Sequence, residues 1–181
     1  MKKGLFTAKQ QQGFSLLELL VSLAIFSILM SIMMPAMSSM IAQNKVTATL
    51  NSFVSKFHVA RSNAISSGIH TIVCPSRDQS SCDNSFDWSD GLIVFADRNN
   101  DRQRDEDEPL IHVWSTNEDD IQILSSTGRR KTIYHADGRT PGTNLTLRFC
   151  PQSESADARA IVISNNGRLR LVDHQTAVDC S

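Results

Sequence analysis

Basic side chains gather near the end of the chain in a pattern that could bind a polyanion. Residues 129–181 carry eight bases against five acids, whereas residues 78–128 carry thirteen acids against three arginines. In Arg168-Leu169-Arg170-Leu171, strand alternation would place both arginines on one face and both leucines toward a core. Arginines beside a turn that contains glycine can hold phosphate groups, although exposed arginines also occur on ordinary solvated strand edges. Further candidates for such a surface, chosen from charge alone, are Arg129, Arg130, Lys131, Arg139 and Arg148.

Acidic side chains in residues 97–108 have the spacing of a calcium-binding loop. Positions 1, 3, 5, 9 and 12 of the twelve-residue EF-hand pattern would be Asp97, Asn99, Asp101, Asp105 and Glu108. Position 6 of that pattern is glycine, but here it is Arg102, and two further arginines lie inside the segment. We therefore expect a solvated loop between strands and no metal site.

The sequence contains no motif of a known catalytic chemistry. A nucleophile elbow, an HExxH pair, a Walker A loop and a dinucleotide-binding glycine motif are all missing, and the five histidines are scattered. We therefore expect no catalytic residue, no cofactor and no small-molecule substrate.

An uncharged apolar span lies close to the N-terminus. No charged residue occurs between Leu19 and Asn44, and Leu19–Met34 is almost wholly apolar, which approaches the length of about 20 residues that a membrane helix needs. Three lysines and no acid precede the span, so residues 1–13 would stay in the cytoplasm by the positive-inside rule. Glu18 lies at the start of the span, where a carboxylate requires a cationic partner.

The run Gly13-Phe14-Ser15-Leu16-Leu17-Glu18 before an apolar helix resembles the class III leader of type IV pilins and type II secretion pseudopilins. The resemblance implies that a prepilin peptidase cleaves after Gly13 and that Phe14 becomes the N-methylated first residue. It implies that Glu18 pairs with a neighbouring subunit's N-terminal amine during assembly. It also implies one span in the inner membrane with the C-terminus in the periplasm, and later incorporation into an extracellular pilus with other major and minor pilins.

Two later runs resemble one branch of this superfamily, the FimT, FimU and GspH proteins. Residues 87–99, DWSDGLIVFADRN, resemble the W-x-x-G…F-x-D-x-N signature of that branch, and residues 134–150 resemble its C-terminal half. Gly167-Arg168-Leu169-Arg170 is similar to the G-R-x-R motif of FimT, which implies binding of extracellular DNA during natural transformation. The alternative is a minor pseudopilin of a type II secretion system, which is GspH-like and does not bind DNA.

Four cysteines allow three disulfide pairings. We favour Cys74 with Cys82, which closes a short polar loop, and Cys150 with Cys180, which ties the C-terminal end to a strand. Export places the domain in an oxidising compartment, where disulfides form. The alternative is a zinc site of His70, Cys74 and Cys82, which the absence of a C-x-x-C pair disfavours.

One long helix and a set of strands must position all these residues. Apolar residues at helical spacing run through residues 46–65, namely Val46, Leu50, Phe53, Phe57, Ala60 and Ala64. After Gly68 the pattern predicts strands at 69–74, 92–96, 110–115, 121–124, 131–135, 145–150, 160–164 and 168–172, with a hairpin turn at Asn166-Gly167. The expected fold is α+β and type IV pilin-like, with the long N-terminal helix packed on an antiparallel sheet domain. Its parts are a cleaved leader at 1–13, a helix at 14–67 (membrane and filament core at 14–40, amphipathic at 41–67) and a GspH/FimT-like β domain at 68–181.

Overall fold

A computed structural model describes residues 14–115, 120–153, 155–172 and 180. The chain divides into two compact units, Met1–Ser38 and Ser39–Ser181, and the second unit contains all the strands. Among the described residues, the helix α1 (Leu16–Ser67) is the one element that contributes residues to both units. The strands are β1 (His70–Pro75), β2 (Gly91–Asp97), β3 (Leu110–Ser115), β4 (Ile121–Ser125), β5 (Thr132–Tyr134), β6 (Leu145–Pro151), β7 (Arg159–Ile163) and β8 (Leu169–Val172).

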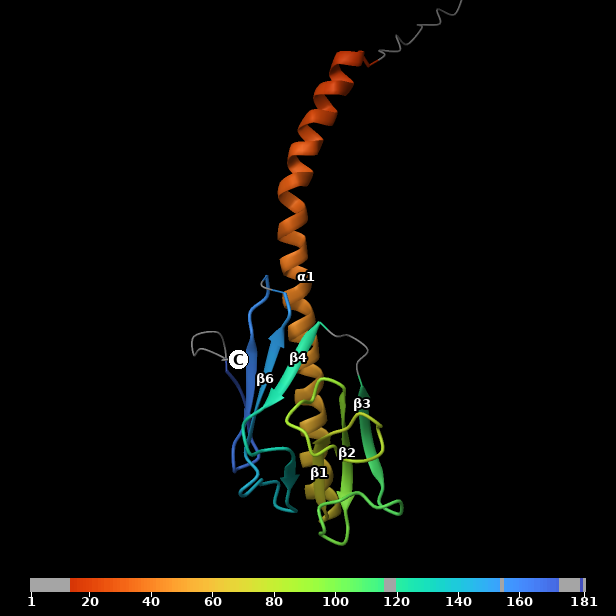
Figure 1. The fold of residues 1–181 in the computed structure, drawn as a ribbon, viewed down its shortest axis with the longest axis vertical. Helices are drawn as coiled ribbons and strands as arrows, with labels where there is room; N and C mark the ends of the chain where they lie inside the picture. Colours follow the sequence, from red (N-terminus) through yellow and green to blue (C-terminus); the bar gives the residue numbers. More distant parts are fainter. Residues whose placement is uncertain (1–13, 116–119, 154, 173–179, 181) are drawn as a thin grey trace, which may run out of the picture. The chain divides into compact units, whose positions relative to one another are not determined.

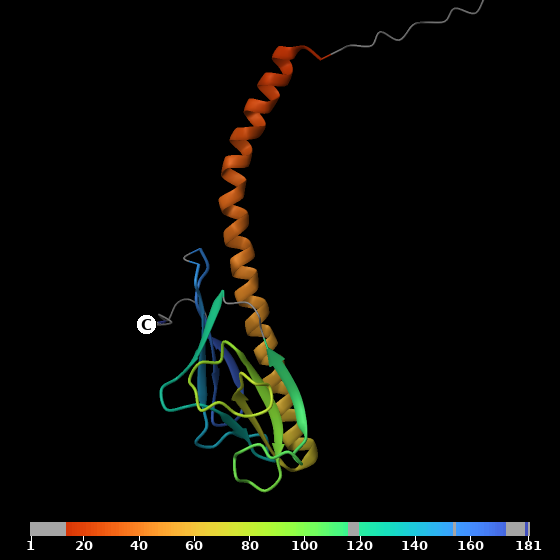
Figure 2. The ribbon, with the colours of Figure 1, turned by 45° about the vertical axis from the view of Figure 1, so that its right-hand side comes forward.

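The strands form two antiparallel sheets, each with four strands. The first sheet has the order β3-β2-β1-β5, and the second has the order β4-β6-β7-β8 (Figure 1). All six strand pairs are antiparallel, and the second half of α1 runs alongside the strands in both ribbon views (Figures 1 and 2). The predicted α+β class, a long helix packed on antiparallel sheet, is confirmed.

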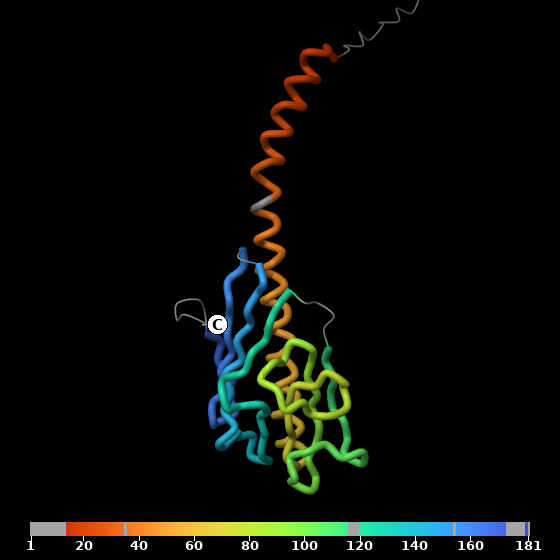
Figure 3. Tube along the Cα trace, in the orientation of Figure 1, coloured from red at the N-terminus to blue at the C-terminus, as the bar shows by residue number. Residues whose placement is uncertain are grey.

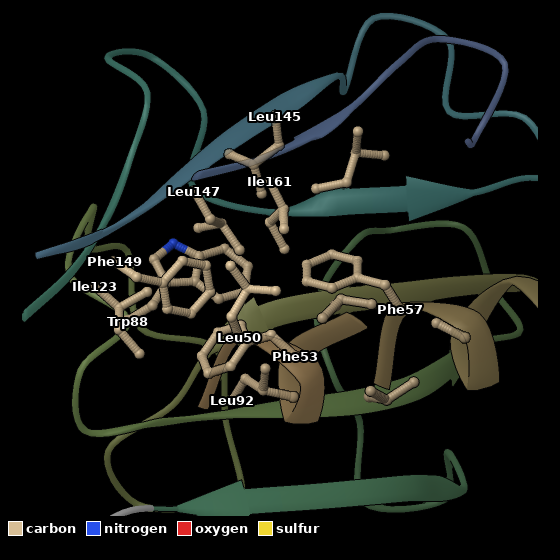
Figure 4. Packing of buried hydrophobic residues seen from close by; sticks show 14 of the residues in the cluster. Leu50, Phe53, Phe57, Trp88, Leu92, Ile123, Leu145, Leu147, Phe149 and Ile161 are labelled. Carbon is tan, nitrogen blue, oxygen red and sulfur yellow. The ribbon is translucent and has the colours of Figure 1, made fainter. Parts of the chain in front are cut away.

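The core lies between the amphipathic part of α1 and the inner faces of both sheets. The six helix positions with helical spacing are all buried, from Val46 to Ala64, and belong to one cluster with residues of both sheets. Phe53 packs edge-on against Trp114 and Phe149, with ring centroids 4.8 and 5.2 Å apart. Figure 4 shows Leu50, Phe53 and Phe57 of the helix pointing toward the strand residues. Every helix residue of this cluster lies at or after Val46, so this core cluster contains none of residues 14–38.

The long segment between β1 and β2 joins the two sheets (Figure 3). The backbone N–H of Trp88 donates to the carbonyl of Ile123 in β4 (2.8 Å), and the N–H of Ser125 donates to the carbonyl of Phe86 (2.8 Å). The Trp88 side chain is fully buried in the core and packs near Phe57. The tryptophan of the W-x-x-G run therefore fills the space between the sheets.

Both disulfides are present with the favoured pairing. Cys74 of β1 is bonded to Cys82, and the pair lies in a second, smaller apolar cluster. Cys150 of β6 is bonded to Cys180, 30 residues further along the chain. The zinc alternative is wrong, because both of its cysteine sulfurs are used in the first disulfide.

Candidate functional site

The first unit begins with a capped helix that carries a carboxylate in its first turn. The Ser15 hydroxyl oxygen accepts a hydrogen bond from the backbone N–H of Glu18 (3.2 Å), which satisfies one free donor of the helix start. The Glu18 side chain is exposed, and a carboxylate is favourable in a first helical turn because of the helix dipole. Gly13, the expected cleavage residue, lies outside the described residues.

The large apolar side chains of this unit that the structure describes, from Phe14 onward, are not covered by other parts of the chain. Phe14 is 82% exposed, and large apolar residues follow it with exposed fractions above one third as far as Ile41. The helix is long and apolar enough to cross a membrane, with a mean hydropathy of 2.4 over its most apolar 18 residues. Such an extended exposed apolar surface marks a contact with lipid or with other protein subunits.

Both arginines of the G-R-x-R run are exposed: Arg170 lies on β8, which is an edge strand, and Arg168 directly precedes that strand. Gly167 precedes them in the turn after β7, with φ of 69°. A Cβ atom at Gly167 would collide with the carbonyl oxygen of Gly138, so this turn lies directly against the backbone of another loop. We call Arg168 and Arg170 the β8 arginines.

A helix side chain also holds this turn in place. Arg61 of α1 donates from Nη1 to the carbonyl of Gly167 (3.1 Å) and from Nη2 to the carbonyl of Asn166 (3.4 Å). No local pattern in the sequence indicates this role of Arg61, because the contact joins residues that are 106 positions apart. The β8 arginines therefore follow a turn that is fixed by backbone packing and by a charged hydrogen bond.

One expected feature of β8 is wrong. Leu169 packs against the core as expected, but Leu171 is 58% exposed. Leu171 lies opposite the buried Ile161, so its side chain is on the core-facing side of the sheet, as expected. Among the described strands β8 has a neighbour on one side only, and Leu169 is its one residue that packs against the buried cluster.

Arg148 shares the outer face of the second sheet with Arg170. Thr146 of β6 lies opposite Val162 of β7, which lies opposite Arg170 of β8. Arg148 is two residues after Thr146 and therefore projects from the same face. The register thus places Arg148 and Arg170 on the same face of the second sheet.

Of the other predicted basic residues, Arg139 lies beside the Gly167 turn, because it follows Gly138, whose carbonyl packs against Gly167. Arg139 is paired with Asp137 across 2.6 Å, and its backbone N–H and its side chain both lower the pKa of the Asp137 carboxyl. Arg129, Arg130 and Lys131 lie in the loop between β4 and β5, next to the loop that follows β2. Arg129, Arg130 and Lys131 therefore share one loop, which is a different loop from that of Arg139.

In the acidic loop between β2 and β3, two carboxylates accept hydrogen bonds from backbone N–H groups of the same loop. Glu108 is buried and accepts hydrogen bonds from the N–H groups of Arg98 (2.7 Å) and Asp105 (3.2 Å). Asp97 is also buried and accepts one from the N–H of Arg102 (3.2 Å). Within the described part of the chain, no three histidine, cysteine or acidic side chains are placed to hold a metal ion.

Comparison with protein families gives two matches. Residues 49–167 match the family described as type II transport protein GspH. Residues 8–34 match the prokaryotic N-terminal methylation motif, which includes Gly13, Phe14 and Glu18. A comparison with curated protein sequences finds no match.

Two kinds of solved structure share this fold. The type IV minor pilin FimU of Pseudomonas aeruginosa superposes with a TM-score of 0.57 at 17% identity, over 72% of this chain and 90% of that chain. The minor pseudopilin EpsH of the Vibrio cholerae type 2 secretion system superposes with a TM-score of 0.50 at 16% identity, over 70% and 95%. Pilins and pseudopilins are structural proteins and not enzymes. With most of its length matching the family model, the chain belongs to the GspH family and is a minor pilin or pseudopilin of the type IV pilus and type II secretion superfamily.

Proposed function

We propose that this chain is a minor type IV pilin whose β domain binds extracellular DNA through Gly167, Arg168 and Arg170. The observation that carries this proposal is the pair of exposed arginines at the start of an edge strand, next to a turn fixed by Arg61. A fixed turn lowers the entropy that the arginines lose when they bind a phosphate. Arg148 adds a third cation on the outer face of the same sheet.

The N-terminal unit would place the domain in the filament. A prepilin peptidase cleaves after Gly13, and Phe14 becomes the methylated N-terminus. Glu18 then pairs with the terminal amine of a neighbouring subunit, because a carboxylate within an apolar bundle requires a cation. The exposed apolar side chains of α1 are covered first by the inner membrane and then by other pilins.

A DNA titration at several salt concentrations tests the DNA part of this proposal. The full-length processed protein in non-ionic detergent is mixed with a labelled DNA duplex, and the dissociation constant is measured between 50 and 200 mM salt. The variant Arg168→Gln/Arg170→Gln removes two phosphate contacts, so the slope of log affinity against log salt should become shallower by about 1.8. The matched control Arg77→Gln/Arg98→Gln removes the same charge from exposed residues outside β8 and should leave the slope unchanged.

The second candidate is a minor pseudopilin, which the description of the matching family as a type II transport protein favours. Such a protein has the same assembly helix and no reason to bind DNA. A wild-type protein with no salt-sensitive DNA binding would contradict the DNA-binding proposal and leave the pseudopilin function. Co-purification with secretion-system pseudopilins, and not with pilus subunits, would identify that function directly.

A further inference from the structure

Two loops of the β domain bring five cations together around adjoining hollows. The hollows have volumes of about 390 and 370 Å³, and both are lined by Arg102, Arg130 and Lys131. The first is also lined by Arg104, and the second by Arg129. We call this surface, lined by Arg102, Arg104, Arg129, Arg130 and Lys131, the basic groove.

Interactions with neighbouring groups hold three of the five cations in place. The Arg130 guanidinium lies over the ring of Phe86, 4.6 Å from its centroid. Arg104 donates from Nη1 to the carbonyl of Ser80 (2.8 Å). Lys131 donates from Nζ to the carbonyl of Arg102 (2.5 Å), which ties one loop to the other. The groove is therefore formed before any ligand arrives.

None of the five cations has an acidic partner among the described residues. The ion pairs found there use Lys45, Arg77 and Arg139. The Nε–H of Arg104 is buried without a hydrogen-bond acceptor, although buried donors are nearly always paired. Burial and the neighbouring charge of Arg102 lower the pKa of Lys131, even though Asp97 and Asp101 act in the opposite direction. Asp83 is the one acidic residue among those that line the two hollows, so five cations face a single acid and the groove has an excess of positive charge.

We propose that the basic groove is a second DNA-binding site, which contacts the phosphodiester backbone independently of the β8 arginines. Guanidinium groups suit phosphate because they donate two parallel hydrogen bonds. A row of cations across two adjoining hollows suits a ligand that repeats its phosphates better than it suits a single small anion. The choice of DNA rests on the proposed function, but the residues that carry the groove are different.

Substitutions in each of the two loops that line the groove test this inference. Arg102→Gln/Arg104→Gln removes two cations from the loop after β2, and Arg129→Gln/Arg130→Gln removes two from the loop before β5. Each variant of the full-length protein in detergent is titrated with the same DNA duplex between 50 and 200 mM salt. Loss of two phosphate contacts makes the slope of log affinity against log salt shallower by about 1.8. Between 50 and 200 mM salt, the affinity of the variant should therefore fall by a factor roughly 12-fold smaller than that of the wild-type protein. Circular dichroism and thermal unfolding report whether each variant is folded.

The controls distinguish this inference from the proposed function. The variant Arg77→Gln/Arg98→Gln again removes two charges, including one from the same loop as Arg102, outside the groove. One outcome is that both groove variants have the same salt slope as the wild-type protein while Arg168→Gln/Arg170→Gln has a shallower one. In that case the groove inference is wrong and the proposed function stands. If only the groove variants have a shallower salt slope than the wild-type protein, the groove binds DNA and the β8 arginines do not. A wild-type protein that binds no DNA contradicts both.

Discussion

Replacing Gly167 by alanine should destabilise the β domain more than the same change at Gly142. The two glycines have the same backbone conformation, with φ of 69° at each. A Cβ atom at Gly142 would meet no atom within 4 Å, whereas at Gly167 it would collide with the carbonyl oxygen of Gly138. The pair therefore separates the effect of the contact from the effect of the dihedral angle.

The size of the difference follows from the groups that must move. A left-handed conformation costs an alanine about 1 to 2 kcal/mol relative to glycine, and this term is common to both sites. At Gly167 the turn must also shift away from Gly138, which breaks the hydrogen bond from Arg61 to its carbonyl. A hydrogen bond to a charged group contributes about 1.5 to 3 kcal/mol. The expected loss is about 3 to 5 kcal/mol for Gly167→Ala, against about 1 to 2 kcal/mol for Gly142→Ala.

Thermal unfolding of the two variants under oxidising conditions measures this difference. For a domain of this size, 1 kcal/mol corresponds to about 3 °C in the melting temperature. Gly167→Ala should therefore melt at least 5 °C or so below Gly142→Ala. Equal melting temperatures would show that the turn after β7 is not packed against the Gly138 loop, and the description of a fixed DNA-binding turn would be wrong.

Three further variants test other parts of the structure. Glu18→Ala should leave the protein in the membrane but reduce its incorporation into sheared filaments, as measured by immunoblotting, and normal incorporation would contradict the assembly role of the carboxylate. Cys150→Ser/Cys180→Ser should lower the free energy of unfolding by about 3 to 4 kcal/mol, because the bond closes a loop of 30 residues, and urea titration would detect this. Lowering the pH from 7.5 to 5.5 should reduce the melting temperature, because burial and His70 hold the pKa of His135 below its ordinary value. As the pH falls through the ordinary histidine pKa, the unfolded chain binds the His135 proton before the folded chain does, so the free energy of unfolding decreases. The variant His135→Gln should therefore show a weaker dependence of the melting temperature on pH. An unchanged dependence in that variant would assign the effect to other groups.

The elements of the fold could be predicted from local patterns in the sequence. The helix positions from Val46 to Ala64 follow a period that only a one-sided helix produces, and all are buried. The eight strands lie within one or two residues of their predicted bounds, because turn residues and alternating apolar residues mark them. These features could be predicted because they depend on residues that are close together in the sequence.

The features that the sequence did not predict depend on distant contacts. Arg102 and Arg104 were assigned to an acidic loop because acids surround them in sequence, but the fold turns them toward Lys131 of another loop. Leu171 obeys the alternation and is still exposed, because its burial depends on how far the core extends under an edge strand. Arg61 reaches the turn after β7 only because the helix packs beside it.

The second disulfide has a mechanical consequence for a domain that would hold a polymer under tension. Cys150 lies in β6, an interior strand, and β7 and β8 both fall between Cys150 and Cys180. The edge strand β8, with Arg170 on it and Arg168 directly before it, is therefore enclosed in a covalent ring. A pull on that strand could separate it from β7, but the chain beyond it would remain fastened to β6. Force would be transmitted to the interior of the sheet, and unravelling from the C-terminal end would stop at the ring.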